Sequence, residues 1–527
     1  MKSSTGEVGK PLTDTKGTPL RFVTGSSLFD GHDAAINMIR RLLQSQGAEV
    51  IHLGHNRSVQ ELVDAAIQED ADGLAVSSYQ GGHNEFFKYM VDELRANNAG
   101  HIQVFGGGGG VILPSEIEAL QAYGVNRIYS PQDGQKMGLE GMIGDMIARA
   151  AQVRDARKKI DTACSPESIK ALANNWPLLT QLITRLERDE VPAADLDVIR
   201  EQAKASKTPV LGITGTGGAG KSSLTDELIR RLRMDHGDDL TIGVVCVDPS
   251  RRKTGGALLG DRIRMNAIGP WAGNGPKVFM RSLATRDSAQ EVPATLPDII
   301  ALCRATGFDV VLIETPGIGQ GDAAIVPHVD FSLYVMTPEY GAASQLEKID
   351  MLDFADFVAV NKFDRKGALD ALRDVCKQVQ RNRMAFTSMP DTMPVYGTLA
   401  SRFNDDGVSA LYKALRAALP IAKPSKGLFD SIDTKHSTTM KAVVPSERVR
   451  YLAEIAQAVR SYKAQVQKDV AAVYDLECMQ RAQALLLEHK PDKTKAVEAL
   501  DDIVELTNTR ISMAAQKAMK DYSKLTE

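Results

Sequence analysis

Residues 215–222 form a glycine-rich run, GTGGAGKS, that matches the pattern G-x-x-x-x-G-K-[ST]. An apolar stretch over 210–213 precedes this run, and a helix-prone stretch over 223–228 follows it. A strand, a glycine loop and a helix N-terminus in this order form a phosphate cradle, because glycine lets backbone N–H groups approach phosphate oxygens. The run therefore predicts a P-loop, with Lys221 at the β- and γ-phosphates and the Ser222 hydroxyl on Mg²⁺. We expect the nucleotide phosphates to contact Gly215, Gly218, Ala219, Gly220, Lys221, Ser222 and Ser223.

A second motif, N-K-x-D at residues 361–364, follows an apolar run over 357–360 that is typical of a buried strand. A carboxylate at Asp364 can accept two hydrogen bonds from the N1–H and 2-amino groups of guanine. Adenine would leave this carboxylate unpaired, which costs free energy. The motif therefore favours GTP over ATP, and the segment 398–401 is a candidate for the loop that closes over the base. We expect contacts to the base from Asn361, Lys362 and Asp364.

Three acidic residues are candidates for the magnesium site. Asp248 and Glu314 each end an apolar stretch, and Asp261 lies in the segment LGDRIRM. Since Mg²⁺ takes about six oxygen ligands and keeps several waters, these carboxylates, Ser222 and phosphate oxygens would fill one site or two. An Asp is usual where Glu314 stands, so contact through water is the alternative to direct ligation there. For Asp261, a solvated ion pair with Arg264 is the alternative interpretation.

Two arginines near Asp261 are candidates for neutralising charge on the phosphates, as arginines supplied in cis do in other P-loop enzymes. The sequence leaves the choice between Arg262 and Arg264 open, and we include Arg264 among the GTP-binding residues. Segments near Asp261 and over 317–322 are expected to contact the γ-phosphate and to move when it leaves. The region after 337–341 is a further candidate switch.

Residues 19–147 alternate strand-like and helix-like stretches, which predicts an α/β domain with a parallel, doubly wound sheet. Ligands of such sheets lie beyond the carboxyl ends of the strands. Three strands end there in Asp30-Gly31-His32, in a Ser-Ser-Tyr turn at 77–79, and in five glycines at 106–110. A His near an Asp can ligate a metal while its second ring nitrogen bonds the carboxylate. An ordinary loop histidine is the alternative, but the glycine wall at the same edge favours a large ligand.

These loops resemble the D-x-H-x-x-G, S-x-L and G-G motifs of cobalamin-binding domains. In that family the His replaces dimethylbenzimidazole as the lower ligand of cobalt, and the nucleotide tail enters the core along the Ser and Gly-Gly positions. The resemblance implies a flavodoxin-like fold, with His32 as the axial ligand and Asp30 as its partner. It also implies a tail slot lined by Ser77, Gly106 and Gly107.

This chain departs from the cobalamin-binding motifs at two positions. Ala35 stands where the motif has Gly, so the chain must avoid positive φ there. Tyr79 stands where the motif has Leu, which would narrow the slot or change its polarity. Neither departure removes the expected cobalt ligand.

The P-loop half resembles the G-protein chaperones of acyl-CoA mutases at 248–250, 260–265, 314–320 and 361–364. A cobalamin domain followed by such a chaperone is the order found in fused isobutyryl-CoA mutases, and this resemblance covers residues 20–425. It implies an adenosylcobalamin-dependent isomerase component whose GTPase gates cofactor loading and protects the mutase. Those enzymes continue into a barrel that binds the acyl-CoA, and no barrel pattern follows here. We therefore expect either a separate subunit or the front part of a longer protein, with a barrel subunit or domain as partner.

Two other functions are compatible with the same motifs. The chain could store or carry cobalamin, with the GTPase timing its release and no mutase activity of its own. It could also transfer methyl groups on methylcobalamin, since the same His motif serves both chemistries. The adjoining chaperone-like GTPase favours the mutase over the methyltransferase.

Composition narrows the class of partner and the compartment. A net charge of −4 without a basic stripe argues against nucleic acid as a partner. No apolar run of about 18 residues is present, which predicts no membrane span, and the polar N-terminus lacks a signal-peptide core. Five cysteines without a C-x-x-C pair fit a reducing compartment, so we expect a cytoplasmic protein.

The chain is long enough for two or three domains. We expect a flexible N-terminus over 1–18, a cobalamin-binding domain over 19–148, a helical linker over 149–208, a P-loop GTPase domain over 209–425 and a helical C-terminal region over 426–527. The linker is expected to brace the two domains rather than to bind a ligand. Apolar helix faces in the C-terminal region need cover, which favours a homodimer contact or a docking arm. A helical pair folded on its own GTPase domain is the alternative.

Overall fold

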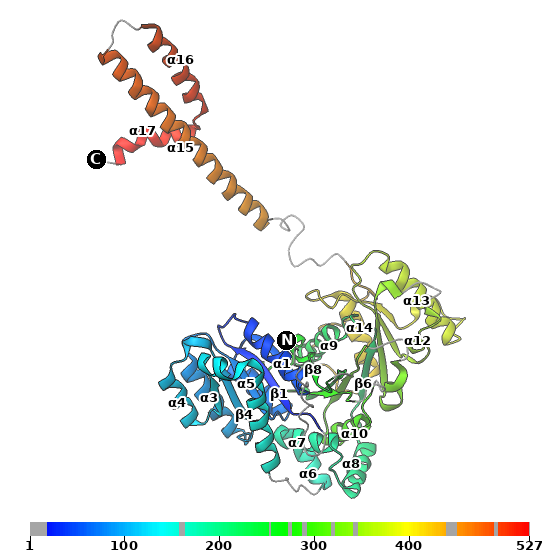
Figure 1. Ribbon diagram of the computed structural model, residues 1–527. Coiled ribbons are helices and arrows are strands. Elements are labelled where there is room, and N and C mark those ends of the chain that lie inside the picture. The colour runs from blue at the N-terminus through cyan, green and yellow to red at the C-terminus, as the bar shows by residue number, and fades with distance from the viewer. Residues whose placement is uncertain are drawn as a thin grey trace, which may run out of the picture. The chain divides into compact units, whose positions relative to one another are not determined.

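The computed structural model describes residues 18–157, 164–251, 254–271, 277–286, 292–317, 322–340, 346–438, 451–489 and 494–525. The chain forms two compact units that meet in sequence between Thr438 and Thr439 (Figure 1). The first unit holds two parallel sheets, and the described residues of the second are almost all helical. The predicted flexible N-terminus over 1–18 lies outside the described residues, apart from Thr18.

The N-terminal sheet confirms the predicted alternation of strands and helices. Its strand order is β5-β4-β3-β1-β2-β8, and every pair is parallel. The first five strands are β1 (Arg21–Ser27), β2 (Glu49–Arg57), β3 (Gly73–Ser77), β4 (Gln103–Gly107) and β5 (Arg127–Tyr129). The helices are α1 (Ala34–Ser45), α2 (Val59–Gln68), α3 (His83–Ala96), α4 (Pro114–Tyr123) and α5 (Pro131–Ala156). The order of the first five strands is flavodoxin-like, so this fold class is confirmed.

Helices cover both faces of the N-terminal sheet, as the wholly buried strands require. Helices α1 and α5 pack on one face, around Phe22 and Phe105. Helices α2, α3 and α4 pack on the other face, around Val23 and Leu74. The carboxyl ends of the strands therefore remain as the open edge where loops can bind a ligand.

The second sheet has the order β13-β12-β11-β6-β10-β7-β9, with all pairs parallel. Its strands are β6 (Val210–Gly215), β7 (Ile242–Asp248), β9 (Val278–Ala284), β10 (Val310–Glu314), β11 (Phe331–Met336), β12 (Phe357–Val360) and β13 (Val395–Gly397). Its helices are α9 (Lys221–Asp235), α10 (Leu296–Thr306), α12 (Met351–Phe354), α13 (Ala368–Asn382) and α14 (Asp406–Ala418). Strand β6 is central and fully buried, and it leads through the glycine loop into α9, which confirms the P-loop fold.

Three helices lie between the two sheets in sequence: α6 (Pro166–Ala171), α7 (Trp176–Glu187) and α8 (Ala193–Ala205). Pro192 directly precedes α8, in the short gap that separates α7 from α8. Leu179 and Ile183 of α7 belong to the same apolar cluster as strands β7 and β9 of the second sheet. At the end of α7, Glu187 forms ion pairs with Arg21 of β1 and Arg281 of β9. The linker thus contacts both sheets, as a brace would.

The sixth strand of the N-terminal sheet comes from the P-loop half of the chain. Strand β8 (Ala257–Leu259) follows β7 in sequence, yet it pairs in parallel with β2. Ala257 and Leu259 are buried in the apolar core of the N-terminal domain. Gly256 permits this approach, because a Cβ there would lie 2.3 Å from the carbonyl oxygen of Gln44. No sequence pattern predicted this exchange of a strand between domains.

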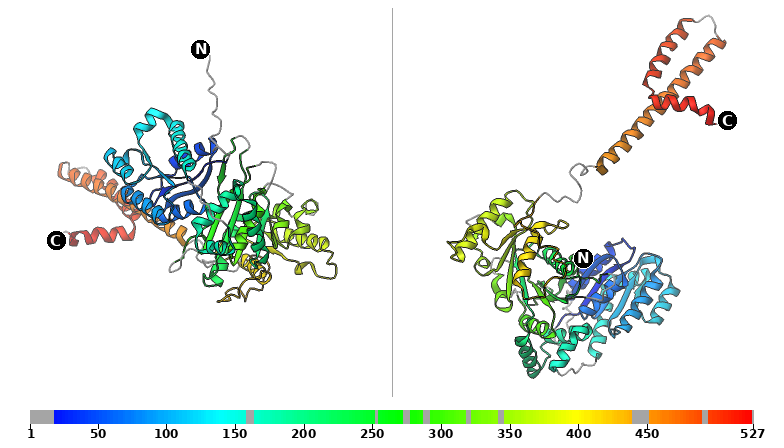
Figure 2. Two further views of the ribbon diagram at one scale, coloured as in Figure 1. Left: turned by 90° about the horizontal axis from the view of Figure 1, so that it is seen from below. Right: turned by 180° about the vertical axis from the view of Figure 1, so that it is seen from behind.

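The second unit consists of α15 (Tyr451–His489), α16 (Thr494–Arg510) and α17 (Met513–Leu525). Figure 2 shows α16 running back along α15, where Gln483 Nε2 donates to Asp501 Oδ1 at 2.7 Å. Residues 426–438 belong to the first unit, in which Gly397 forms a β-bridge with His436. The domain boundaries given above, including 425/426, stay predictions. No helix among the described residues is long and apolar enough to cross a membrane.

Gly256→Ala is expected to destabilise the first unit by about 1–3 kcal/mol, because overpacking against fixed backbone forces the strand outward. The thermal unfolding midpoint of the full chain should fall, and the amides of β8 should exchange faster with deuterium. Gly269→Ala is the control, since no atom lies within 4 Å of its added Cβ. Equal midpoints for the two variants would contradict the close approach of β8.

Candidate functional site

The P-loop is held in shape by its own backbone. Gly215, Gly218 and Gly220 have φ values of 142°, 75° and 92°, in the left-handed region that only glycine adopts without strain. A Cβ at Gly215 would also lie 1.9 Å from the carbonyl oxygen of Val335. Lys221 Nζ donates to Gly215 O at 3.0 Å, so its ammonium lies over the loop. Ala219, Ser222 and Ser223 complete the predicted phosphate-binding run at the start of α9.

Ser222 lies between two buried carboxylates at the foot of the P-loop. Its Oγ is 2.8 Å from Asp261 Oδ1 and 2.8 Å from Glu314 Oε1. Thr225 Oγ1 donates to the other oxygen of Glu314 at 3.0 Å. Ligand atoms of Cys246, Asp261 and Glu314 all lie within 4.8 Å of one another. Hydroxyl and carboxylate oxygens are the ligands that Mg²⁺ prefers, so this donor set fits that ion.

Two acidic groups near Ser222, Glu314 and Asp248, have raised pKa values. Burial, reinforced by the charge of Asp261, raises the pKa of Glu314 to about 8. Burial and Asp261 likewise raise the pKa of Asp248 to about 8, although Gly260 N donates to Asp248 Oδ2 at 3.0 Å. Several anions in a dry site repel one another, and a bound cation would remove that cost. The structure therefore brings Ser222, Asp261 and Glu314 together and puts Asp248 beside the same segment.

The two candidate arginines have different surroundings. Arg262 is buried, and its Nη1 donates to Glu69 Oε1 at 3.1 Å and to Met280 O at 3.2 Å. A phosphate role for Arg262 is therefore wrong, because its guanidinium is bonded to the N-terminal domain. The side chain of Arg264 is 66% exposed and lies 3.7 Å from Asp261. Arg264 remains the candidate of the two.

The N-K-x-D segment is tied to the P-loop through Asn361. Its Nδ2 donates to Ala219 O at 2.7 Å. Its Oδ1 accepts from Thr398 Oγ1 and Ala400 N, both at 3.1 Å. The two predicted base segments and the phosphate loop therefore meet at one side chain. Lys362 and Asp364 follow at the carboxyl end of β12, where Asp364 is exposed.

His32 is held by Asp30 at the carboxyl end of β1. Its Nδ1 lies 2.9 Å from Asp30 Oδ1, and its backbone N–H donates to the same oxygen at 2.9 Å. The other carboxylate oxygen accepts from Tyr79 N at 2.8 Å. The side chain of Asp30 is fully buried, whereas that of His32 is 74% exposed. Since Nδ1 is bonded to the carboxylate, Nε2 is the ring nitrogen left to ligate a metal.

A cavity of about 450 Å³ lies between the N-terminal sheet and the helices α1 and α5. Ser77 lines it, and the buried Ser77 Oγ has no hydrogen-bond partner among the described residues. Gly107 lines it too, and a Cβ there would meet a single atom within 4 Å, Tyr129 O at 3.6 Å. A Cβ at Gly106 would instead lie 2.6 Å from the Phe87 ring, so that glycine permits packing on α3. An apolar cavity that contains one hydroxyl without a hydrogen-bond partner fits the nucleotide tail of a cobalamin, because the tail could bond to that hydroxyl.

Some residues of these sites were missed from the sequence. Thr225 lies one helical turn after Ser222, so it shares that face of α9. Cys246 precedes Asp248 by two residues on β7, and alternate residues of a strand share a face. These spacings could have pointed to both residues. Met142 and Met146 of the cavity wall carry no such signal, because methionine also fills ordinary apolar cores.

Comparison with known proteins finds a matching family for the N-terminal domain and another for the P-loop domain. The family described as "Methylmalonyl Co-A mutase-associated GTPase MeaB" matches residues 179–469, and the B12 binding domain family matches residues 20–131. The fused isobutyryl-CoA mutase of Cupriavidus metallidurans is 62% identical over 451 residues, 85% of this chain and 40% of that protein. The fused isobutyryl-CoA mutase of Nocardia farcinica is 55% identical over 474 residues, covering 89% and 43% of the two chains. That of Geobacillus kaustophilus is 50% identical over 469 residues, covering 86% and 41%. This chain thus spans less than half the length of these relatives.

The pKa of Glu314 makes stability without ligand depend on pH. Its pKa is about 8 in the folded chain and 4.5 as a free side chain, so the folded state binds that proton more tightly. This contribution to stability is present below the free pKa and is lost as the pH rises through about 8. Without nucleotide and metal, the thermal midpoint of Glu314→Gln should therefore fall less than that of wild type between about pH 5 and pH 8. The exposed Glu201→Gln is the control, and parallel profiles for wild type and Glu314→Gln would refute the raised pKa.

Proposed function

Because the chain belongs to the family of methylmalonyl-CoA mutase-associated GTPases of the MeaB type, we propose that it serves a mutase of this kind as its cofactor-binding and GTP-hydrolysing part. The substrate that we propose for the whole assembly is isobutyryl-CoA, which is rearranged to n-butyryl-CoA. One observation carries this proposal. A B12-binding domain and a GTPase domain form one compact unit whose sequence follows that of fused isobutyryl-CoA mutases.

The proposed cobalamin site uses the carboxyl end of the N-terminal sheet. His32 would ligate cobalt through Nε2, with Asp30 holding the imidazole from Nδ1. Ser77 would donate to the nucleotide tail in the cavity, beside the backbone of Gly106 and Gly107. When bound, adenosylcobalamin supplies the radical chemistry of the mutase. The residues of this chain bind the cofactor, orient it and leave the substrate to a partner.

The proposed GTPase site uses the P-loop edge of the second sheet. Lys221 would move from the loop carbonyl to the β- and γ-phosphates, and Ser222 would ligate Mg²⁺. Asp248, Asp261 and Glu314 are the proposed carboxylates of the metal site, directly or through water. Arg264 would approach the phosphates, and Asp364 would accept from the guanine edge. Loss of the γ-phosphate would release the Asp261 segment, and this movement would gate cofactor loading and protection of the mutase.

The proposal also includes partners. A barrel subunit or domain would bind the acyl-CoA, since the relatives are more than twice as long as the part that matches. A homodimer and a cytoplasmic location also belong to the proposal. The exposed tyrosines and aliphatic residues along α15, such as Tyr462 at 71% exposure, offer a face for such contacts.

His32→Ala should remove the histidine ligand from bound cobalamin while GTP hydrolysis persists, because the Ser222 cluster belongs to the other sheet. EPR of cob(II)alamin on protein labelled with ¹⁵N-histidine reports this directly, because a ¹⁵N ligand splits each cobalt line into two, whereas the ¹⁴N of dimethylbenzimidazole splits it into three. His55→Ala is the control, because His55 is an exposed histidine of the same domain. A ¹⁵N splitting that survives in His32→Ala would contradict the assignment of His32 as the axial ligand.

Turnover of isobutyryl-CoA separates the mutase from a cobalamin carrier. The chain is mixed with adenosylcobalamin, GTP and Mg²⁺, with or without the separately expressed barrel of a fused isobutyryl-CoA mutase. We expect n-butyryl-CoA only when chain and barrel are both present, because this chain carries no acyl-CoA site of its own in the proposal. Tight cobalamin binding without turnover in either mixture would favour the carrier and contradict the mutase.

A further inference from the structure

The segment that carries Asp261 belongs to the GTPase by sequence and to the cobalamin domain by packing. It leaves the GTPase sheet at Asp248 and enters the N-terminal sheet as β8 beside β2. Leu259, two residues before Asp261, has no exposed surface and lies in the core of the cobalamin domain. The Asp261 carboxylate beside Ser222 therefore follows closely after β8, a strand that is paired into the sheet of the cobalamin domain.

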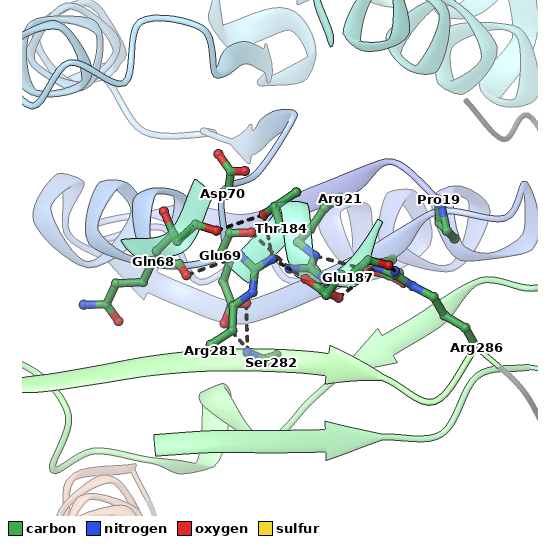
Figure 3. Close-up of polar contacts among 12 residues, drawn as sticks. Pro19, Arg21, Gln68, Glu69, Asp70, Thr184, Glu187, Arg281, Ser282 and Arg286 are labelled. Carbon is green, nitrogen blue, oxygen red and sulfur yellow. Dashed lines mark hydrogen bonds and ion pairs between the residues drawn. The ribbon is translucent and has the colours of Figure 1, made fainter. Parts of the chain in front are cut away.

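A second anchor lies immediately after Asp261. The side chain of Arg262 is 6% exposed, and it reaches α2 of the cobalamin domain and the residue that follows it. Its Nη1 donates to Glu69 Oε1 at 3.1 Å, and its Nη2 donates to Gln68 Oε1 at 2.5 Å. Glu69 also accepts from Ser282 N at 3.0 Å and from Ser282 Oγ at 2.9 Å. Figure 3 shows Glu69 beside Ser282 of β9.

Asp261 is thus fixed on both sides by the cobalamin domain. On one side, β8 pairs with β2 of the cobalamin domain. On the other side, Arg262 is bound by a fully buried carboxylate. A buried guanidinium whose partner is removed must find another or drag its backbone toward water. Since Asp261 is bonded to Arg262 through the chain, such a shift would move its carboxylate away from Ser222.

We propose that Glu69 of the cobalamin domain is a positioning residue of the GTPase metal site, holding Asp261 beside Ser222 through Arg262. The proposal rests on the proposed function for the identity of the metal and nucleotide. Orienting a metal ligand of the GTPase in this way is a role that Glu69 would not need if it only supported the cobalamin site or only stabilised the fold by an ion pair. The GTPase domain alone would then lack the support that orders one of its own metal ligands.

This arrangement also connects the cobalamin site with the metal site of the GTPase, so that a change at either site would affect binding at the other. Strand β2 pairs with β8, and near its carboxyl end Asn56 Oδ1 accepts from Phe29 N at 2.8 Å, next to Asp30. Any state of the cobalamin loop that shifts β2 would therefore change the metal affinity of the GTPase. Linkage requires the reverse effect as well, so metal and nucleotide would change the affinity for cobalamin by the same factor.

Binding of Mn²⁺ to the chain loaded with GDP tests the proposal without relying on turnover. EPR titration gives the Mn²⁺ dissociation constant for wild type, Glu69→Gln and Arg262→Met. Loss of a residue that orients a metal ligand weakens metal binding by about 10-fold or more, and we expect this for both variants. Arg262→Lys should lie between, because it keeps the charge but makes fewer hydrogen bonds. Affinity for fluorescent GDP in EDTA should stay unchanged, since the hydrogen bonds that Glu69 accepts among the described residues come from Arg21, Arg262 and Ser282.

Glu187→Gln is the matched control. Glu187 is buried at the same domain interface and is bound to Arg21 and Arg281, but it makes no contact with the Asp261 segment among the described residues. We expect a fall in thermal midpoint like that of Glu69→Gln, with an unchanged Mn²⁺ constant. Equal Mn²⁺ constants for Glu69→Gln, Arg262→Met and wild type would overturn the positioning role, as would equal weakening in Glu187→Gln. Failure of wild type to bind Mn²⁺ with GDP would instead overturn the proposed function.

Discussion

A buried network of carboxylates and guanidinium groups fixes the two sheets of the first unit against each other. Glu187 of the linker helix α7 is held by Arg21 of β1, by Arg281 of β9 and by Arg286, which also binds Glu49 of β2. Burial alone would raise the pKa of Glu187, but the charges of Arg21, Arg286 and Arg281 outweigh it and lower that pKa. Both domains and the linker must be in place to satisfy these charges. Since a buried charge without its partner is costly, the network permits few other arrangements of the domains.

That fixed arrangement is a precondition for the two proposed ligand sites to influence each other. Each site uses a buried carboxylate to hold a residue that faces the ligand: Asp30 holds His32, and Glu314 holds Ser222. The two carboxylates differ in how far their surroundings stabilise the negative charge. Asp30 is satisfied by three hydrogen bonds, whereas burial and a neighbouring charge raise the pKa of Glu314. The nucleotide site is thus poised to gain from a cation, while the cobalamin loop is already ordered.

The sequence predicts those parts of the fold that rest on local patterns. Strand–helix alternation, the glycine loop before Lys221 and the position of His32 beside Asp30 all depend on neighbours in the chain, and the structure has them as expected. The features that could not be predicted from the sequence depend on contacts between residues that are far apart in the chain. Strand β8 is three residues long, too short for a periodic pattern, and its partner β2 belongs to another domain. Arg262 looked like a phosphate ligand because charged residues near a P-loop usually face solvent or nucleotide, whereas its partner Glu69 lies 193 residues away.

The position of β8 also bears on how the cobalamin domain avoids pairing with other chains. Without β8, strand β2 would be an edge of the sheet, with unpaired backbone groups along residues that are buried from Glu49 to Gly54. An apolar edge of this kind invites aggregation or strand exchange, and proteins cover, charge or twist such edges. Here the GTPase half supplies the cover, at the point where Gly256 lets the chain approach α1. The same strand that carries Asp261 to the nucleotide site therefore protects the cobalamin sheet, so the two domains depend on each other for structure as well as for the proposed function.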